Sequence, residues 1–353
     1  MKSIYDNWLA VETGADYFAG ANTPSGFQSS YDTIADESRL DRVYIIKGGS
    51  GTGKSTLLYS IAAAAENRGS ACEYYLCGSD PDSLDCVVID RKIAVLDGTS
   101  PHVREMHCPG ASSAIIDVSR FWDSAKLEPH RDEIAAHSAM KQAAYASCYR
   151  WLAAADEVHR ERLALAEILF NRPKAEAFIG RLIAKLGKTE PGESRTLWSH
   201  AVTMKGRWHT RVKESGRIFT VNDSLGTAPV FLALLDRILT ERKIPHTTAV
   251  LPLTDTPSTI ALDSVGVTVT ACLKNGSPIN MTRFIRDDVP TNLRGRIRLT
   301  GEITQSCLNA AADSLKEAAD HHFAVEQIYK PAMDFKSLSR YGGSVTKEIL
   351  TRL

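Results

Sequence analysis

Residues 42–60 read RVYIIKGGSGTGKSTLLYS. Val43–Ile46 is a short apolar run typical of a buried strand, and Lys54–Asn67 has the composition of a helix. The turn between them, Gly48–Ser55, fits the pattern G-x-x-x-x-G-K-S/T in full. Because the strand and the helix both lie where that pattern requires them, the stretch predicts a phosphate-binding loop.

Each residue type in this turn suits a phosphate. Glycines let the backbone wrap an anion with its N–H groups pointing inward, and the helix N-terminus adds partial positive charge there. We expect Lys54 to reach the β- and γ-phosphates and the Ser55 hydroxyl to bind Mg²⁺. The residues expected to contact the nucleotide are Gly48, Gly49, Ser50, Gly51, Thr52, Gly53, Lys54, Ser55 and Thr56.

Two aspartates compete for the magnesium shell. Asp97 ends the apolar run Ile93–Leu96, where a strand-end carboxylate commonly holds Mg²⁺, whereas Asp80 follows the predicted strand Cys72–Cys77 and is also explained as a turn residue before proline. His102 could contact the γ-phosphate, although a lone loop histidine is more often a surface residue. The expected catalytic residues are Lys54, Asp97 and Asp80, and the expected metal ligands are Ser55 and Asp97.

The second half of the sequence repeats the first. Arg217–Ala233, RIFTVNDSLGTAPVFLA, aligns without a gap on Arg42–Leu58, RVYIIKGGSGTGKSTLL. Further along, the same alignment carries Asp80 onto Asp255. The pattern indicates a second strand, turn and helix of the same kind.

The chemistry of the second turn differs from that of the first. Pro229 stands in place of the lysine, Val230 in place of the serine, and Asp223 in place of the first glycine. An aspartate there would repel a phosphate, and neither proline nor valine supplies a charge or a magnesium ligand. We therefore predict a degenerate loop that keeps the fold and binds no nucleotide.

The expected fold class is α/β. We predict a P-loop NTPase-like parallel sheet with flanking helices, duplicated in tandem and carrying helical inserts. The first domain would span residues 1–187, with an intact loop and a helical insert over Glu128–Leu186. The second would span residues 188–353, with a degenerate loop and C-terminal helices. Gly187–Glu193, GKTEPGE, is typical of a linker.

Composition excludes several classes of protein. The 353 residues carry 42 Lys+Arg and 42 Asp+Glu, so a basic nucleic-acid surface is not expected. No apolar run is long enough for a membrane span, and the first residues lack the apolar core of a signal peptide. The seven cysteines are scattered without C-x-x-C spacing, which argues against a zinc site or a redox pair. These features predict a cytoplasmic protein with reduced thiols.

The chain resembles an uncharacterised group of bacterial tandem P-loop ATPases, typical of Firmicutes and usually described only as ATP-binding proteins. The resemblance rests on the runs FAGANTPSGF, IIKGGSGTGKSTLL, CGSDPDSLD, LDGTSPH, CPGA, FWD and IYKPAMDF. It implies two P-loop halves with ATP and Mg²⁺ as ligands. Both halves often look competent in that group, and this sequence departs from it at Asp223, Ala228, Pro229 and Val230.

We therefore expect a Mg-ATP-binding P-loop NTPase with one competent site, working as a slow ATPase or a nucleotide-dependent switch. No glutamate follows Asp97, which argues against a fast motor-type hydrolase. One alternative is a small-molecule kinase, with the helical insert as a lid, and another is a non-catalytic ATP-sensing scaffold. The expected partners are the nucleotide and either a second copy of the chain or another protein, with no membrane.

Overall fold

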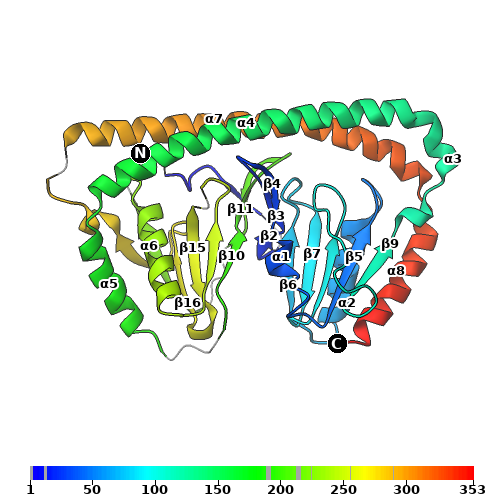
Figure 1. Cartoon of the computed structure of the whole chain (residues 1–353), viewed down its shortest axis with the longest axis horizontal. Coiled ribbons are helices and arrows are strands. Elements are labelled where there is room, and N and C mark those ends of the chain that lie inside the picture. Colours follow the sequence, from blue (N-terminus) through cyan, green and yellow to red (C-terminus); the bar gives the residue numbers. More distant parts are fainter. Residues whose placement is uncertain are drawn as a thin grey trace.

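The computed structural model describes residues 3–11, 14–187, 192–211, 216–223, 225–254, 256–288 and 290–353. The fold is α/β, with a 12-stranded mixed sheet, flanking helices, and two long helices along one edge of the sheet (Figure 1). Within these ranges, no helix has both the length and the apolar character needed to cross a bilayer.

The first half of the sheet is built around the strand that precedes the glycine-rich turn. Its neighbours on both sides run parallel to it, and β7 runs antiparallel to both of its own neighbours. In spatial order the strands are β2 (Tyr17–Phe18), β6 (Cys72–Leu76), β7 (Leu84–Ile89), β8 (Ile93–Asp97), β5 (Arg42–Lys47) and β9 (Ser113–Asp117).

The expectation of a parallel sheet was therefore wrong. The reason lies in the turn between β7 and β8, where Asp90 and Arg91 have φ angles of 50° and 56°. Two successive residues with positive φ form the tight turn of a β-hairpin, which joins neighbouring strands antiparallel. A helical crossover, which a parallel pair requires, is not present at this point of the chain.

The second half of the sheet has the same strand order and the same pairing senses. Its strands are β10 (Arg195–Trp198), β14 (Thr247–Val250), β15 (Pro257–Leu262), β16 (Val267–Thr270), β13 (Arg217–Asn222) and β17 (Ser277–Asn280). The two halves join where Trp198 of β10 pairs antiparallel with Phe18 of β2.

Shorter elements occupy matching places in the two halves. A hairpin follows the first strand of each half, β3 (Gly20–Thr23) with β4 (Gly26–Ser29) and β11 (His200–Thr203) with β12 (Gly206–His209), and β1 (Leu9–Ala10) extends the second hairpin. The short helices are α1 (Tyr31–Ile34), α3 (Ser124–Leu127), η1 (Ser119–Phe121), η2 (Glu128–His130), η3 (Asp263–Val265), η4 (Met281–Phe284) and η5 (Lys330–Ala332).

The two long helices, α4 (Arg131–Leu169) and α7 (Thr291–Tyr329), each contain 39 residues. They run antiparallel, since His137, Ser147 and Glu161 of α4 contact His321, Ser314 and Arg296 of α7 in that order. Apolar residues spaced three or four apart form their interface, which is typical of helix pairs. These are Ala144, Cys148, Leu152 and Ala155 of α4, with Leu308, Ala311, Leu315 and Ala318 of α7.

The last helices of the two sequence halves are exchanged. After α4 has crossed the molecule, α5 (Arg172–Ala184) packs in the second core with α6 (Ala228–Glu241). After α7 has crossed back, α8 (Phe335–Leu350) packs in the first core against α2 (Lys54–Glu66) (Figure 1). The boundary expected at residue 187 thus separates the two sets of strands but not the helices that cover them. Residues 188–191 of the expected linker lie outside the described ranges.

Strand β5 lies at the centre of the first core. Tyr44 and Ile46 belong to the cluster under α2 and α8, and Val43 and Ile45 belong to the cluster on the opposite face. A strand covered on both faces is a rigid support. The turn that follows it is therefore held in a fixed position.

Candidate functional site

The glycine-rich turn after β5 wraps tightly and leads directly into α2. Gly51 and Gly53 have φ angles of 69° and 80°, a region that glycine enters without strain. The Thr52 hydroxyl donates to the Gly49 carbonyl oxygen at 2.8 Å, and α2 begins at Lys54. The two glycines therefore allow the backbone to turn sharply between β5 and α2.

Lys54 joins the turn to the neighbouring strand. Its Nζ donates to the Gly49 carbonyl oxygen at 2.6 Å and lies 3.5 Å from the Asp97 carboxylate at the end of β8. Asp97 also accepts hydrogen bonds from the Thr99 amide at 2.9 Å and the Thr99 hydroxyl at 2.5 Å. Burial raises the pKa of Asp97 and the Lys54 charge lowers it, with a net rise. Two of the expected catalytic residues therefore meet at one edge of the sheet.

Ser55 faces the next strand along this edge. Its hydroxyl oxygen accepts a hydrogen bond from the Leu84 amide at 2.9 Å, at the start of β7. The expected magnesium hydroxyl is thus tied to a second strand of the same sheet.

Asp80 is engaged in a different contact. One carboxylate oxygen lies 2.7 Å from Lys205 Nζ, in the turn between β11 and β12, and the other accepts from the Ser83 hydroxyl at 3.0 Å. Lys205 also forms an ion pair with Asp82. Asp80 therefore helps to join the two halves of the molecule, whereas Asp97 faces Lys54.

Two residues that sequence analysis did not select belong to this edge. Asp85 lies at the start of β7, 5% exposed, with its Oδ2 2.7 Å from Nε2 of His102. Cys77 follows β6 and comes close to both of them. Because β7 runs antiparallel to β6 and β8, its first residues lie at the edge of the sheet where β6 and β8 end. A search for strand-end carboxylates would have found Asp85 only if the direction of β7 had been known.

His102 is buried, contrary to the expectation for a lone loop histidine. It is 4% exposed, and its ring packs edge-on against that of Phe27, with the ring centroids 4.4 Å apart. The centroid of the Tyr31 ring lies 5.4 Å from that of His102. Burial lowers the pKa of His102, but the charge and hydrogen bond of Asp85 raise it by more, so the net shift is upward.

The second glycine turn keeps the shape of the first but is filled by its own side chain. Gly226, which aligns with Gly51, has a φ angle of 76°. The Asp223 carboxylate accepts hydrogen bonds at 2.9 Å from the amides of Leu225 and Ala228, the residue at which α6 begins. At the position where the sequence predicts repulsion of a phosphate, a carboxylate thus already accepts from two backbone N–H groups. Asp255, the expected counterpart of Asp80, lies outside the described residues.

A cation on α4 faces this second turn. Arg162 is buried, and a Cβ atom on Gly226 would lie 3.1 Å from its Nε. Burial lowers the pKa of Arg162, while the nearby charge of Asp223 opposes that shift. Arg162 and Asp223 therefore balance each other in charge at the second turn.

The C-terminal part of the chain covers the first turn. A Cβ atom on Gly49 would lie 3.8 Å from Tyr329, the last residue of α7, and one on Gly51 would lie 3.4 Å from Glu326 and Lys330. Lys330 and His322 hold the pKa of Glu326 down at about 2. The helical insert, which is the lid in the small-molecule kinase alternative, extends along α7 to the second half.

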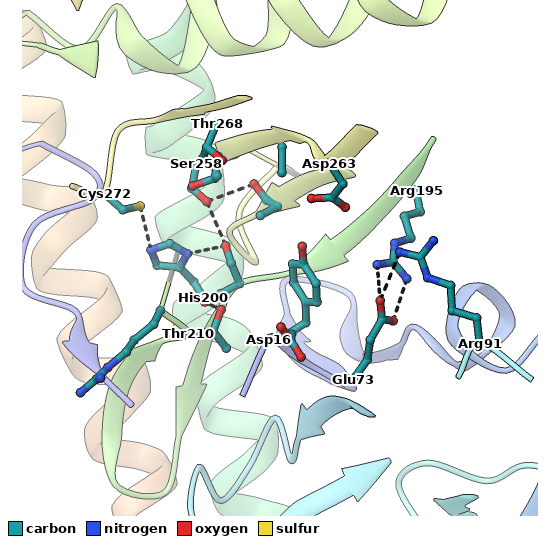
Figure 2. Close-up of a pocket in the computed structure, with 16 residues that line it drawn as sticks. Asp16, Glu73, Arg91, Arg195, His200, Thr210, Ser258, Asp263, Thr268 and Cys272 are labelled. Atoms are coloured by element: carbon teal, nitrogen blue, oxygen red, sulfur yellow. Dashed lines mark hydrogen bonds and ion pairs between the residues drawn. The ribbon is translucent and has the colours of Figure 1, made fainter. Parts of the chain in front are cut away.

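A separate cavity of about 380 Å³ lies where the two halves of the sheet meet (Figure 2). The His200 imidazole lies 2.9 Å from the Ser199 hydroxyl and 3.9 Å from the Cys272 thiol, and Arg195 pairs with Glu73. Burial lowers the pKa of His200 well below its usual value and raises that of Cys272 to about 11. All the lining residues lie outside the two glycine turns.

Comparisons of the chain with protein-family models, with curated proteins and with solved structures found no match.

Proposed function

We propose that this chain is a Mg-ATP-binding P-loop NTPase with one competent site, in the first half, that works as a slow ATPase or a nucleotide-dependent switch. One observation carries the proposal. The Lys54 ammonium lies between the glycine-rich turn and the Asp97 carboxylate, and Asp97 ends a strand that is parallel and adjacent to β5. This is the relative placement that nucleotide phosphates and their magnesium ion require.

In this proposal the residues of the first turn have distinct roles. Lys54 exchanges the Gly49 carbonyl for the β- and γ-phosphates, and the amides of the turn hold the phosphate oxygens. Ser55 and Asp97 would hold Mg²⁺, which neutralises charge on the phosphates when bound. We prefer Asp97 to Asp80 because Asp80 is paired with Lys205. Lys330, beside Gly51, supplies a further cation from the C-terminal segment.

We also propose that the two halves arose by tandem duplication of one P-loop unit, as the resemblance to tandem P-loop ATPases implies. The matching strand order supports this proposal. The N-terminal caps of the exchanged helices support it as well. The Asn171 side chain caps α5 and the Asp334 side chain caps α8, and each accepts a hydrogen bond from the backbone amide three residues later in the chain. The second unit then keeps the fold while Asp223 blocks its turn.

The proposal is tested by calorimetric titration of the full chain with Mg-ATP. We expect one ATP per chain and at least a hundredfold weaker binding by Lys54→Ala, because no other cation lies in the turn itself. Pro229→Ala, at the aligned position of the second turn, is the matched control and should bind normally. Two ATP per chain, or unchanged binding by Lys54→Ala, would overturn the assignment.

The fate of γ-labelled phosphate separates the alternatives. Release as free phosphate that is lost in Lys54→Ala identifies an ATPase or switch. Transfer to a compound in a metabolite extract identifies a small-molecule kinase. Bound ATP without turnover in either condition identifies an ATP-sensing scaffold.

A further inference from the structure

Three side chains of different chemistry converge beside the first turn. The Cys77 thiol, the Asp85 carboxylate and the His102 imidazole each place one donor atom within 4.8 Å of the other two. Cys77 follows β6, Asp85 begins β7, and His102 lies in the loop after β8. All three therefore come from the sheet edge that carries the glycine-rich turn.

The polar atoms of this cluster are buried and incompletely satisfied. Nε2 of His102 and Oδ2 of Asp85 face each other at 2.7 Å, and among the described residues Nδ1 of His102 has no hydrogen-bond partner. Both residues are more than nine-tenths buried. Buried polar groups are nearly always paired in proteins, and exceptions commonly mark a catalytic or ion-binding role.

The surroundings hold the donors in place. Phe27 and Tyr31 pack on the His102 ring. The Tyr31 hydroxyl donates to the backbone carbonyls of Asp85 at 3.1 Å and Asp97 at 2.8 Å, and the Ser79 amide donates to the Cys77 sulfur at 3.4 Å. Such supporting contacts orient the ligands of metal sites.

We propose that Cys77, Asp85 and His102 form a binding site for a borderline-soft divalent metal ion of the Zn²⁺ class, distinct from the magnesium of the nucleotide. One sulfur, one nitrogen and one oxygen are the donors that Zn²⁺ takes, whereas Mg²⁺ requires oxygen alone. Three protein ligands leave a fourth tetrahedral position open, as in catalytic zinc sites. Two ligand atoms that each lie about 2.1 Å from a tetrahedral ion are about 3.4 Å apart. Because Nε2 of His102 and Oδ2 of Asp85 are 2.7 Å apart, these two atoms separate by a fraction of an ångström when the ion binds.

The site is joined to the nucleotide turn through the backbone. Asp85 directly follows Leu84, whose amide holds the Ser55 hydroxyl. The metal site itself does not depend on the nucleotide proposal, because none of its three donors has a role in that proposal.

The test uses metal-free full-length protein titrated with Co²⁺, a spectroscopic stand-in for Zn²⁺, in the absence of nucleotide. We expect one Co²⁺ per chain, a thiolate-to-cobalt charge-transfer band, and displacement by one equivalent of Zn²⁺. Cys77→Ser should abolish the band and weaken binding at least tenfold. Cys72→Ser, which alters the half-buried cysteine at the other end of β6, is the matched control and should retain both.

Two further measurements make the outcome decisive. His102→Gln should weaken Co²⁺ binding at least tenfold, and His107→Gln, which alters an exposed histidine of the same loop, should not. X-ray absorption of Zn²⁺-loaded wild-type protein, which needs no variant, should show one sulfur among the ligands. Lack of binding by wild-type protein, a sulfur-free zinc shell, or full binding by folded Cys77→Ser would overturn the proposal. Lys54→Ala should still bind Co²⁺, so failure of the nucleotide proposal would be seen separately.

Discussion

At the scale of single residues, Lys54 is held by two acceptors of different kind, the neutral Gly49 carbonyl and the Asp97 carboxylate. In the proposed function, the Gly49 carbonyl is exchanged for a phosphate oxygen when a nucleotide binds. The Lys54 side chain would then already be in position, which reduces the ordering that binding requires.

We predict that Asp97→Asn removes the magnesium dependence of ATP binding, because an amide oxygen is a weaker ligand than a carboxylate for a hard cation. ATP affinity measured with and without Mg²⁺ should differ at least tenfold in wild-type protein and less than threefold in Asp97→Asn. Asp80→Asn should behave as wild type. The reverse pattern would make Asp80 the magnesium ligand.

An ion pair between Asp236 of α6 and the buried His246, just before β14, predicts a pH-dependent stability. Nε2 of His246 lies 3.0 Å from Asp236, and its Nδ1 lies 2.7 Å from the Ile244 carbonyl oxygen, so both ring nitrogens face acceptors. Burial lowers the pKa of His246 but these acceptors raise it by more, and the pKa of Asp236 is lowered by His246 and Thr248 despite burial.

The sign of the effect follows from these directions. The His246 contribution is complete below its unfolded pKa of about 6.5 and is lost as pH rises through its higher folded pKa. The Asp236 contribution is lost only in acid. Asp236→Asn should therefore lower the unfolding free energy by about 1–2 kcal/mol at pH 6 and by clearly less at pH 9. Urea unfolding at the two pH values measures this, with exposed Glu241→Gln as control, and equal losses would contradict it.

At the scale of elements, the second turn is held together by its own aspartate. Asp223 accepts from the Leu225 amide within the turn and from the Ala228 amide at the start of α6, and it faces the charge of buried Arg162. The same carboxylate thus caps a helix and neutralises a cation. It is a structural residue in a position where the first half has glycine.

We predict that Asp223→Ala costs about 2 kcal/mol of unfolding free energy, since it removes a helix cap and leaves a buried charge less compensated. Asp223→Asn keeps the acceptor and should cost about half as much. Denaturant unfolding compares the two variants. Neither variant should bind a second ATP, because Pro229 and Val230 remain, and a second bound ATP would refute this account of the turn.

The strands and helices near the motif were predictable from sequence, but the directions in which the strands run within the sheet were not. The strand, turn and helix of residues 42–66 follow from local pattern, as do their counterparts at 217–241. The antiparallel β7 depends on the two-residue turn at Asp90 and Arg91, whose residue types do not require positive φ. The position of Asp85 beside the first turn and the burial of His102 both depend on the direction of β7. Sequence spacing could not reveal a metal site whose donors come from three separate segments of the chain.

At the scale of the whole molecule, the exchange of α5 and α8 makes each half incomplete without the other. Leu57, Leu58 and Ile61 of α2 share their core cluster with α8, which comes from the far end of the chain. Burial of such side chains contributes roughly 1.5–3 kcal/mol each. Removing α8 therefore exposes a large part of the first core.

We predict that residues 1–187 and 188–353, produced as two chains in one cell, copurify as a 1:1 complex. Each fragment carries the helix that closes the other's core. Produced alone, residues 1–187 should aggregate or lack a cooperative thermal transition, as measured by circular dichroism. A lone fragment that melts cooperatively near the midpoint of the full chain would contradict the interdependence of the two cores.

One helix lies beside the first turn and contacts the arginine that packs on the second, and this has a mechanical consequence. α7 ends beside Gly51, and near its other end Gly301 lies against Arg162, which packs on Gly226. A helix of 39 residues is a rod about 58 Å long that resists compression along its axis. α7, which packs along α4, therefore forms a rigid connection from the first glycine turn to the arginine that faces the second. A displacement of the first turn that shifts this end of α7 would be carried along the helix to Arg162.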